Sequence, residues 1–371
     1  MQVKAIGKDV GIVAIGRNEG DRLRLCLTAV MAQIAIPEST QAAQPTPTQK
    51  SGTAHSTPTV APIVAPIVYV DSGSTDDSIP LAKSMGVHVV ELDPTLPFTA
   101  ARARNTGFKY LLARYPDLQY IQFIDGDCEL TTRWIQEAYE CLERDAQLAV
   151  VCGHRQESFP ESSVYNRYTN LEWYRPAGEN VQACGGDALI RVEALKSVDG
   201  YNSALICGEE PEMCLRMRRL NWKIQRLDRV MVFHDAAMTE FGQWWRRAVR
   251  GGWAVSEGYA MYGHAPEKYM VHRYLSGWVW GAILPSLAVL LAIQTHGLSL
   301  LLLLLYPVLM LRIFRFCRQS YRYSPTDALV YAFFCTLSKF AQAVGQIQYW
   351  LTRWKRETPL LIEYKKPAAL K

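Results

Sequence analysis

An uncharged stretch of 38 residues limits most strongly what this chain can fold into. No Asp, Glu, Lys or Arg occurs at residues 274–311, between Arg273 and Arg312. A bilayer span needs only about 20 apolar residues, and 38 helical residues would measure about 57 Å, roughly twice the thickness of a bilayer core. The polar residues 294–297 separate two apolar segments, 275–294 and 298–311. We therefore predict a membrane-anchoring helical hairpin at about residues 275–311.

Charge is divided unequally along the chain, whose 371 residues carry a formal net charge of +5. Residues 240–371 hold 16 Lys and Arg against 6 Asp and Glu, a net charge of +10, whereas residues 1–239 hold 24 against 29, a net charge of −5. Four arginines follow the second apolar segment: Arg312, Arg315, Arg318 and Arg322. Basic residues beside apolar spans face the cytoplasm and anionic lipids. We expect a membrane partner rather than nucleic acid, and localisation at the inner or plasma membrane with the N-terminal domain on the cytoplasmic face.

Two further helices are predicted beside the hairpin. Residues 240–273 are rich in Trp and Arg, which is typical of a helical segment lying at a membrane interface. Residues 326–351 predict an amphipathic helix, with Lys339 and several Gln opposite an apolar stripe. An interfacial position is favoured over a third span, because a third span would place the basic tail on the other side of the membrane.

The N-terminal part alternates predicted strands and helices. Apolar, β-branched runs predict strands at residues 10–16, 67–70, 87–92 and 120–124, and helical periodicity lies between them. This order is typical of an α/β fold with a mostly parallel sheet flanked by helices. Ligands bind at the carboxyl ends of such strands. Residues 36–66, with six prolines and only two charges, predict a flexible insertion.

The cysteines and the N-terminus indicate a reduced compartment. Nine cysteines occur singly, with no C-x-x-C pair, so buried thiols are expected rather than a disulfide framework. The first 20 residues have no basic region followed by a long apolar stretch, and we predict no signal peptide.

The clearest chemical motif is Asp125-Gly126-Asp127, which follows an apolar strand. Two carboxylates at such a position can hold one hard cation, Mg²⁺ or Mn²⁺, which in turn binds phosphate oxygens. The alternative is a polar turn that only ends the strand. Asp71 ends an earlier strand and can accept hydrogen bonds from a nucleoside, while Ser74 to Asp77 can cap the following helix.

These motifs, taken in order, resemble those of the glycosyltransferase family 2 nucleotide-sugar transferases with the GT-A fold. The matching residues cover about residues 10–235: Asn18-Glu19, residues 70–74 with Asp76, residues 103–107 with Arg104 and Asn105, Asp125-Gly126-Asp127, and residues 208–213 with Arg216. The C-terminal part resembles that of membrane-associated members of the family.

The resemblance implies roles for the matching residues. Asp71 would face the nucleotide base, with Asn18, Glu19, Arg104 and Asn105 also at the nucleotide. Asp125 and Asp127 would hold a Mg²⁺ or Mn²⁺ ion that neutralises charge on the leaving nucleoside diphosphate.

Family members invert the anomeric carbon, and one carboxylate deprotonates the attacking acceptor hydroxyl. The second residue of an acidic Glu-Asp pair is that base, and here it is Glu210, one methylene longer than Asp. Glu209 is the alternative base. A charged helix start would also explain these glutamates.

Six more residues are candidates for the same site. His234 follows an apolar run and is predicted to complete the metal site, although a core histidine fits the pattern as well. Gly186 and Asp187 are predicted near the sugar, with a simple turn as the alternative, and Trp173 could stack on a sugar ring or lie in the core. Gln243 and Arg246 partly match the Gln-x-x-Arg-Trp pattern of processive polysaccharide synthases, but Arg247 replaces the Trp.

The sequence therefore predicts an inverting, metal-dependent glycosyltransferase. Its catalytic domain would occupy residues 1–239, followed by the interfacial segment 240–273 and the membrane-anchoring region 274–371. The donor would be a nucleotide-diphosphate sugar, and the acceptor a sugar or lipid-linked hydroxyl in polysaccharide or glycolipid synthesis. A non-catalytic GT-A scaffold is one alternative. A nucleotidyl or phosphoryl transferase is another, although G-x-x-x-x-G-K-[ST] does not occur.

Overall fold

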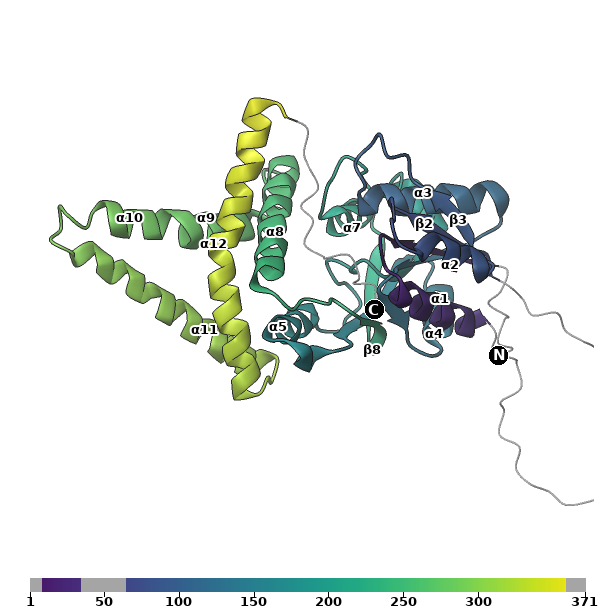
Figure 1. The fold of residues 1–371 in the computed structure, drawn as a ribbon, viewed down its shortest axis with the longest axis horizontal. Coiled ribbons are helices and arrows are strands. Elements are labelled where there is room, and N and C mark those ends of the chain that lie inside the picture. Colours follow the sequence, from purple (N-terminus) through teal and green to yellow (C-terminus); the bar gives the residue numbers. More distant parts are fainter. Residues whose placement is uncertain (1–8, 35–64, 358–371) are drawn as a thin grey trace, which may run out of the picture.

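A computed structural model of the chain describes residues 9–34 and 65–357. These residues form an α/β domain followed by a set of long helices (Figure 1). The α/β domain contains β1 (Val10–Gly16), α1 (Asp21–Ile34), β2 (Ile67–Asp71), α2 (Ser78–Ser84), β3 (His88–Glu91), α3 (Ala100–Arg114), β4 (Tyr120–Asp125), β5 (Cys128–Leu130), α4 (Trp134–Arg144), β6 (Leu148–Glu157), α5 (Val164–Trp173), β7 (Ala188–Arg191), α6 (Val192–Ser197), α7 (Glu209–Arg219) and β8 (Lys223–His234). The helical part contains α8 (Phe241–Tyr262), α9 (Val271–Trp278), α10 (Leu284–Leu290), α11 (Leu305–Ser320) and α12 (Pro325–Lys355).

The strands form one eight-stranded sheet in the order β3-β2-β1-β4-β7-β6-β8-β5. Strands β3, β2, β1 and β4 are parallel neighbours, and β6 and β8 are also parallel. β7 runs antiparallel to both β4 and β6, and β5 runs antiparallel to β8. The predicted mostly parallel sheet is therefore a mixed sheet whose first half is fully parallel.

Helix α3 lies unusually close to β1 because a glycine faces the strand. A Cβ atom on Gly107 would lie only 2.4 Å from Cγ1 of Val13. β1 is buried almost along its whole length, since helices cover a sheet whose strands are apolar on both faces. The close contact fixes the position of α3, which carries Arg104 one turn before Gly107.

Helices α8 and α12 also meet through glycines. A Cβ atom on Gly252 of α8 would lie 2.1 Å from the carbonyl oxygen of Gln342, and one on Gly345 of α12 would lie 2.0 Å from that of Val249. The two helices lie side by side in Figure 1, with α8 between α12 and the α/β domain. Trp244 and Trp253 of α8 are buried in this packing, against Phe334 and Tyr349 of α12 respectively. Much of the Trp pattern that predicted an interfacial segment at 240–273 is therefore explained by packing within the protein.

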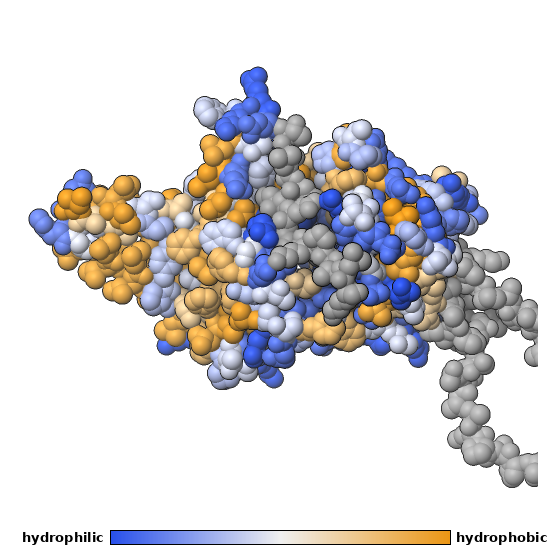
Figure 2. All heavy atoms as spheres, in the orientation of Figure 1, coloured by the Kyte–Doolittle hydropathy of each residue, from blue (hydrophilic) through white to orange (hydrophobic). Residues whose placement is uncertain are grey.

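A helical hairpin projects away from the α/β domain beyond α12 (Figure 1). Its first arm is α9, a π-helical turn at Val279–Ile283 and α10, and its second arm is a 3-10 helix at Leu298–Leu304 followed by α11. His296 and Gly297, both with positive φ, lie in the turn between the arms. Apolar side chains are exposed along both arms and near the tip, where Ile293 is 89% exposed. Figure 2 shows this apolar surface at the left end of the molecule.

Two helices are long and apolar enough to cross a membrane, among the residues that the structure describes. They are Leu298–Ser320, with a mean hydropathy of 2.1, and Pro325–Lys355, with a mean hydropathy of 1.3. The most apolar window of the first is 6% buried, and that of the second is 44% buried because α12 packs on α8 and α11.

The sequence-based predictions of the elements are largely confirmed. The four predicted strands correspond to β1 to β4, and a hairpin turns at the predicted residues 294–297. The second arm continues past residue 311 to Ser320, because Arg312, Arg315 and Arg318 are part of the same helix. The predicted helix at 326–351 is α12, and its interfacial position stays a prediction. The predicted flexible insertion at 36–66 lies almost entirely outside the described residues.

Candidate active site

Carboxylates gather where β4 ends, at the centre of the sheet. Asp125 is the last residue of β4, and Asp127 precedes β5. Two groups of possible ligand residues occur here, Asp127 with Cys128 and His234, and Asp125 with Cys128 and Asp187, and within each group the ligand atoms lie within 4.8 Å of one another. The sequence motif therefore supplies two clusters that share Cys128, with His234 beside Asp127 and Asp187 beside Asp125.

Asp125 is held by a buried arginine. Nη2 of Arg104 lies 2.7 Å from Oδ1 of Asp125, and Nη1 of the same guanidinium lies 2.6 Å from Oε1 of Glu209. Burial opposes the charge on Arg104, but the two carboxylates outweigh it and raise the pKa of Arg104 above its usual value. Arg104 thus links the Asp125-Gly126-Asp127 motif to Glu209 at the start of α7.

Asp187 and Gly186 lie next to Asp125. The backbone N–H of Asp125 donates to Oδ1 of Asp187 at 2.8 Å, and Asp187 is fully buried. A Cβ atom on Gly186 would lie 2.7 Å from Nη2 of Arg104 and 2.8 Å from Oδ2 of Asp125. The sequence predicts these two residues near a sugar, and their contacts show that they support Asp125.

Asp127 and His234 approach one another closely. Nε2 of His234 lies 3.2 Å from Oδ2 of Asp127, and both side chains are buried. Nδ1 of His234 is buried and has no hydrogen-bond partner among the described residues. Two adjacent ligands of an octahedral ion, each about 2.1 Å from it, lie about 3.0 Å apart. The Asp127 and His234 atoms therefore have the spacing of two neighbouring ligands of one hard cation.

Trp173 packs against this pair. Its ring meets that of His234 edge-on, with centroids 4.4 Å apart. Helix α5 ends at Trp173, and Arg247 of α8 holds the neighbouring Glu172 through an ion pair. Although burial opposes it, Arg247 lowers the pKa of Glu172. The indole thus belongs to the wall of the site.

Arg155 lies in the candidate site and was not predicted from the sequence. Its guanidinium donates to Asp187, lies 3.5 Å from Oδ2 of Asp125, and lies over the Trp173 ring at 5.4 Å. The signal available in the sequence was an arginine near the end of an otherwise apolar strand, Leu148 to Gly153. The site therefore offers two guanidinium groups, Arg104 and Arg155, beside its carboxylates.

Glu210 points away from Asp125. Its Oε1 accepts hydrogen bonds from the backbone N–H of Cys184 at 2.5 Å and from Sγ of Cys214 at 3.3 Å. Burial raises the pKa of Glu210, although the hydrogen bonds from Cys184 partly offset this. The loop Cys184 to Gly186 lies between Glu210 and Asp125, because a Cβ atom on Gly186 would meet Asp125 and the N–H of Cys184 donates to Glu210. The structure therefore brings Glu209 into the acidic cluster and places Glu210 on the other side of a thin loop.

The predicted nucleotide-binding residues shape the loop after β2. Asp71 is fully buried and accepts hydrogen bonds from the N–H groups of Gly73 and Ser74 and from the hydroxyl of Tyr69. Oδ1 of Asn18 accepts from the N–H of Thr75 at 2.7 Å. These contacts fix the loop after β2 and join it to the loop after β1.

Glu19 and Asn105 also have partners within the protein. Glu19 pairs with Arg22 at 2.9 Å. Asn105 donates to the carbonyl oxygen of Tyr201 and accepts from its N–H, so it holds the loop before α7. Their predicted contact with a nucleotide stays a prediction.

Gln243 and Arg246 lie at the start of α8. Gln243 accepts hydrogen bonds from the backbone N–H groups of Thr239 and Glu240, and with Glu240 it forms a capping box. Arg246 is exposed on the same helix. The partial Gln-x-x-Arg match therefore contains a helix cap, and the predicted contact of these residues with sugar or acceptor stays a prediction.

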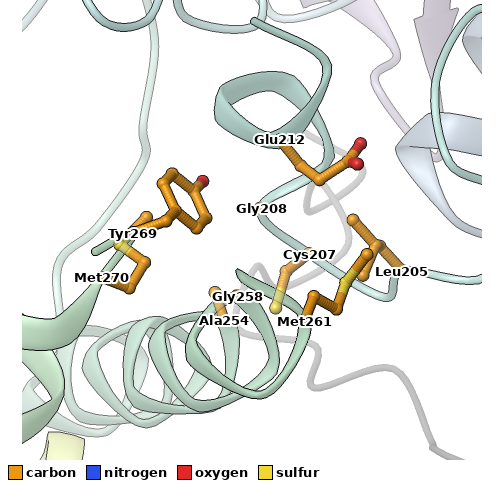
Figure 3. A pocket seen from close by; sticks show the side chains of 9 residues that line it. All are labelled: Leu205, Cys207, Gly208, Glu212, Ala254, Gly258, Met261, Tyr269 and Met270. Atoms are coloured by element: carbon orange, nitrogen blue, oxygen red, sulfur yellow. The ribbon is translucent and has the colours of Figure 1, made fainter. Parts of the chain in front are cut away.

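A narrow cavity lies between the α/β domain and α8 (Figure 3). Its volume is about 10 Å³, close to the room that one water molecule needs. Figure 3 labels its lining residues, which include Gly208, Glu212, Ala254 and Tyr269. The carboxylate of Glu212 is bound by Arg216 and by the hydroxyl of Tyr262 at 2.8 Å. The α/β domain and α8 are therefore closely packed beside the acidic pair.

Comparisons with known proteins agree with this fold. Residues 64–198 match the family described as Glycosyl transferase family 2. A mannosyltransferase from Pyrobaculum calidifontis, solved in complex with GDP-Man and Mn²⁺, is similar in structure with a TM-score of 0.58 at 14% identity, over 94% of this chain and 88% of that chain. Residues 1–349 of S. aureus TarS align with a TM-score of 0.47 at 11% identity, over 94% and 92% of the two chains. No curated protein matches the chain. The α/β domain therefore has the GT-A fold.

Proposed function

We propose that this chain, a glycosyltransferase with a family 2 domain, transfers a sugar from a nucleoside diphosphate to a hydroxyl of a lipid-linked or membrane-proximal acceptor. The single observation that carries the proposal is the contact of Asp127 with His234, two buried potential ligands at the carboxyl edge of the sheet. A nucleoside diphosphate carries the charge that a cation held there would neutralise. The similar mannosyltransferase was solved with a nucleotide sugar and Mn²⁺.

Asp127 and His234 would hold a divalent cation, Mg²⁺ or Mn²⁺. A carboxylate oxygen suits both ions, and a neutral imidazole suits Mn²⁺ as well. When bound, the cation supplies Lewis-acid stabilisation of the leaving diphosphate. Asp125, held by Arg104, would contribute from the adjacent cluster.

Two arginines supply further positive charge for the diphosphate. Arg104 and Arg155 both contact Asp125, and the Arg155 guanidinium lies over the Trp173 ring. Guanidinium groups suit phosphate oxygens because they donate in a planar fork. Asn18, Glu19, Asp71 and Asn105 would form the nucleoside end of the site through the loops that they hold. Asp187, Trp173, Gln243 and Arg246 would contact or support the sugar and acceptor.

The base that deprotonates the acceptor hydroxyl would be Glu210, with inversion at the anomeric carbon. A raised pKa makes a carboxylate a stronger base, and burial raises the pKa of Glu210. Its present hydrogen bond to Cys184 must break for the carboxylate to reach the acceptor side of the loop. Glu209, paired with Arg104, is the alternative base.

The helical part would place this site beside a membrane. The hairpin exposes apolar side chains along both arms, and two helices have the length and hydropathy of spans. The basic residues at the end of α11, among them Arg315 and Arg318, favour contact with anionic lipids on the cytoplasmic side.

The test combines donor binding with sugar transfer. The full-length protein in detergent is screened with a panel of nucleotide sugars, each with Mn²⁺, Mg²⁺ or chelator, by thermal unfolding. A donor at 100 times its dissociation constant stabilises by about 2.7 kcal/mol. We expect one donor class to raise the unfolding temperature with Mn²⁺ and not with chelator, and labelled sugar to reach a lipid extract.

Asp127→Ala should abolish both the cation-dependent stabilisation and the transfer. Asp117→Ala, at an exposed aspartate after α3, is the matched control and should preserve them. Transfer that continues with chelator and in Asp127→Ala would overturn the metal assignment. Donor binding without transfer to any acceptor would favour a non-catalytic scaffold.

A further inference from the structure

Two cysteines and a glutamate meet in the buried space between α7 and the loop before β7. Sγ of Cys214 lies 3.7 Å from Sγ of Cys184 and 3.3 Å from Oε1 of Glu210. All three ligand atoms lie within 4.8 Å of one another, and all three residues are buried. This cluster lies outside the Asp127 and His234 pair, and sugar transfer as proposed uses neither thiol.

Local structure brings the three groups together without any characteristic sequence spacing. Glu210 and Cys214 are four residues apart on α7 and so share one face of the helix. The backbone N–H of Cys184 donates to Glu210, which fixes the loop over that face. The three side chains are therefore in position before any metal ion binds.

The distances match those around a tetrahedral thiophilic ion. Two thiolates, each about 2.3 Å from a tetrahedral zinc ion, lie about 3.8 Å apart. The observed separation of the two sulfur atoms is 3.7 Å. A thiolate and a carboxylate oxygen on the same ion lie closer together, since zinc–oxygen bonds are about 2.0–2.2 Å long. The expected separation is about 3.6 Å, and the 3.3 Å between Cys214 and Glu210 is slightly shorter, so the carboxylate would move outward a little on binding.

We propose that Cys184, Cys214 and Glu210 form a binding site for one thiophilic divalent cation, Zn²⁺ in the first instance. The three ligands occupy three positions of a tetrahedron, which leaves the fourth for a water molecule or a further ligand. On binding, both thiols release their protons to solvent, and the carboxylate binds as the anion.

The surrounding charge supports a bound ion. Two thiolates and one carboxylate carry three negative charges, so one negative charge remains after a divalent cation binds. Arg226 donates to the carbonyl oxygen of Ala183 at 2.8 Å, and Arg218 donates to that of Gln182. Both arginines therefore lie beside the loop that carries Cys184.

Binding of the cation would withdraw Glu210 from the acceptor. This consequence rests on the proposed function, because it matters only if Glu210 is the base. The site itself does not depend on sugar transfer, and its test measures metal binding alone.

The test titrates the reduced, full-length protein in detergent with Co²⁺, which gives intense thiolate-to-cobalt charge-transfer absorption. We expect the charge-transfer bands to saturate at one thiolate-bound Co²⁺ per chain with tetrahedral spectra, displaced by Zn²⁺; a second Co²⁺ at Asp127 and His234 would lie outside these bands. Cys184→Ser and Cys214→Ser should each abolish the two-thiolate spectrum. Glu210→Gln should keep charge-transfer absorption but weaken Co²⁺ binding about tenfold or more.

Two control variants separate this site from the other cysteines. Cys207→Ser changes a buried cysteine whose Sγ lies 3.5 Å from the carbonyl oxygen of Arg250, and it should leave the spectrum unchanged. Cys128→Ser removes the single sulfur of the Asp127 and His234 cluster and should also leave it unchanged. Loss of the spectrum in Cys128→Ser alone would overturn the proposal.

Three other outcomes would also overturn it. The first is a wild-type protein without charge-transfer absorption. The second is an unchanged spectrum in folded Cys184→Ser and Cys214→Ser. The third is a disulfide between Cys184 and Cys214. It would show as seven titratable thiols before reduction and nine after it, and either serine variant would abolish this difference. Glu210→Gln retains both thiols and tests the site independently if a serine variant fails to fold.

Discussion

Arg167 and Asp327 form an ion pair, with 2.8 Å between Nη2 and Oδ1, that joins α5 to the first turn of α12. The two helices lie far apart in the sequence. Helix α5 ends at Trp173, which packs on His234. The ion pair therefore connects the C-terminal helix to the wall of the candidate active site.

Breaking this pair should loosen α12 from α5. Because both side chains are partly buried and the geometry is good, we expect a coupling free energy of about 1 kcal/mol between Arg167→Ala and Asp327→Ala in a double-mutant cycle of unfolding. The control is the pair Arg144 and Glu140, whose arginine is 70% exposed. Its coupling should stay below about 0.5 kcal/mol. Equal coupling in the two cycles would contradict the structural role of Arg167.

A single methyl group should separate α8 from α12. Gly345→Ala places a Cβ within 2.0 Å of a backbone carbonyl oxygen, so the helices must move apart, at a cost of about 3 kcal/mol or more. Gly251→Ala is a matched control beside Gly252, because its Cβ would meet no atom of the described residues within 4 Å. It should stabilise α8 by about 0.5–1 kcal/mol. Thermal unfolding in detergent measures both, and a tolerated Gly345→Ala would show that the helices are not in contact there.

The sequence predicted those elements whose cause is local. Apolar β-branched runs identified β1 to β4, and the polar residues 294–297 identified the hairpin turn. The antiparallel position of β7 between β4 and β6 could not be predicted, because a four-residue strand carries no information on its neighbours.

The site was predictable only in part for a similar reason. Motif residues such as Asp125 and Asp127 are visible as pairs, whereas Arg155 reaches them from a distant strand. The opposite orientations of Glu209 and Glu210 depend on tertiary contacts, with Arg104 for one and Cys184 for the other. The same holds for Trp244 and Trp253, whose burial depends on α12.

His234 should contribute to cation binding, and this can be measured without any sugar. We expect His234→Ala to weaken Mn²⁺ binding about 10–100-fold, as followed by the paramagnetic resonance signal of free Mn²⁺. His154→Ala is the matched control, since His154 lies on β6 and pairs with Asp228 at 2.9 Å. It should bind Mn²⁺ like the wild type. Equal affinity in the two variants would remove His234 from the proposed site.

The two glutamates at the start of α7 should respond differently to neutralisation. Glu210→Gln should lower kcat by about 10²-fold or more with little change in donor affinity, because it removes a base. Glu209→Gln should instead weaken donor binding and lower the unfolding temperature, since it removes a partner of the buried Arg104. Steady-state kinetics and donor titrations separate the two effects. If only Glu209→Gln loses turnover while it binds donor normally, the base is Glu209.

Stability should depend on pH through Glu257 of α8. Burial raises the pKa of Glu257 to about 7, although Trp253 and Arg353 oppose the rise. Between about pH 4.5 and 7 the folded state then binds more protons than the unfolded state, so the free energy of unfolding falls as pH rises through this range. Glu257→Gln should remove this decrease and be more stable than the wild type by about 1 kcal/mol at pH 8, allowing for partial exposure.

The pKa of Glu267 is shifted in the opposite direction, so its effect on stability changes with pH in the opposite sense. The hydrogen bond from Arg219 lowers the pKa of Glu267 to about 2, so its contribution is present above about pH 4.5 and is lost as pH falls toward 2. Glu267→Gln should therefore lose stability at neutral pH and not at pH 2. Unfolding curves at several pH values test both glutamates, and identical profiles for the two variants would contradict the assignment.

The glycine contacts between α8 and α12 also determine what the chain can reach. Helix α8 begins seven residues after His234, and backbone atoms of α12 touch it at two places, so neither helix can slide or tilt past the other. A membrane into which the hairpin inserts would therefore lie at a fixed distance from Asp127 and His234. If the chain acts as proposed, an acceptor anchored in that membrane would have to present its hydroxyl at this distance, so the length of the acceptor's spacer would matter alongside its chemistry.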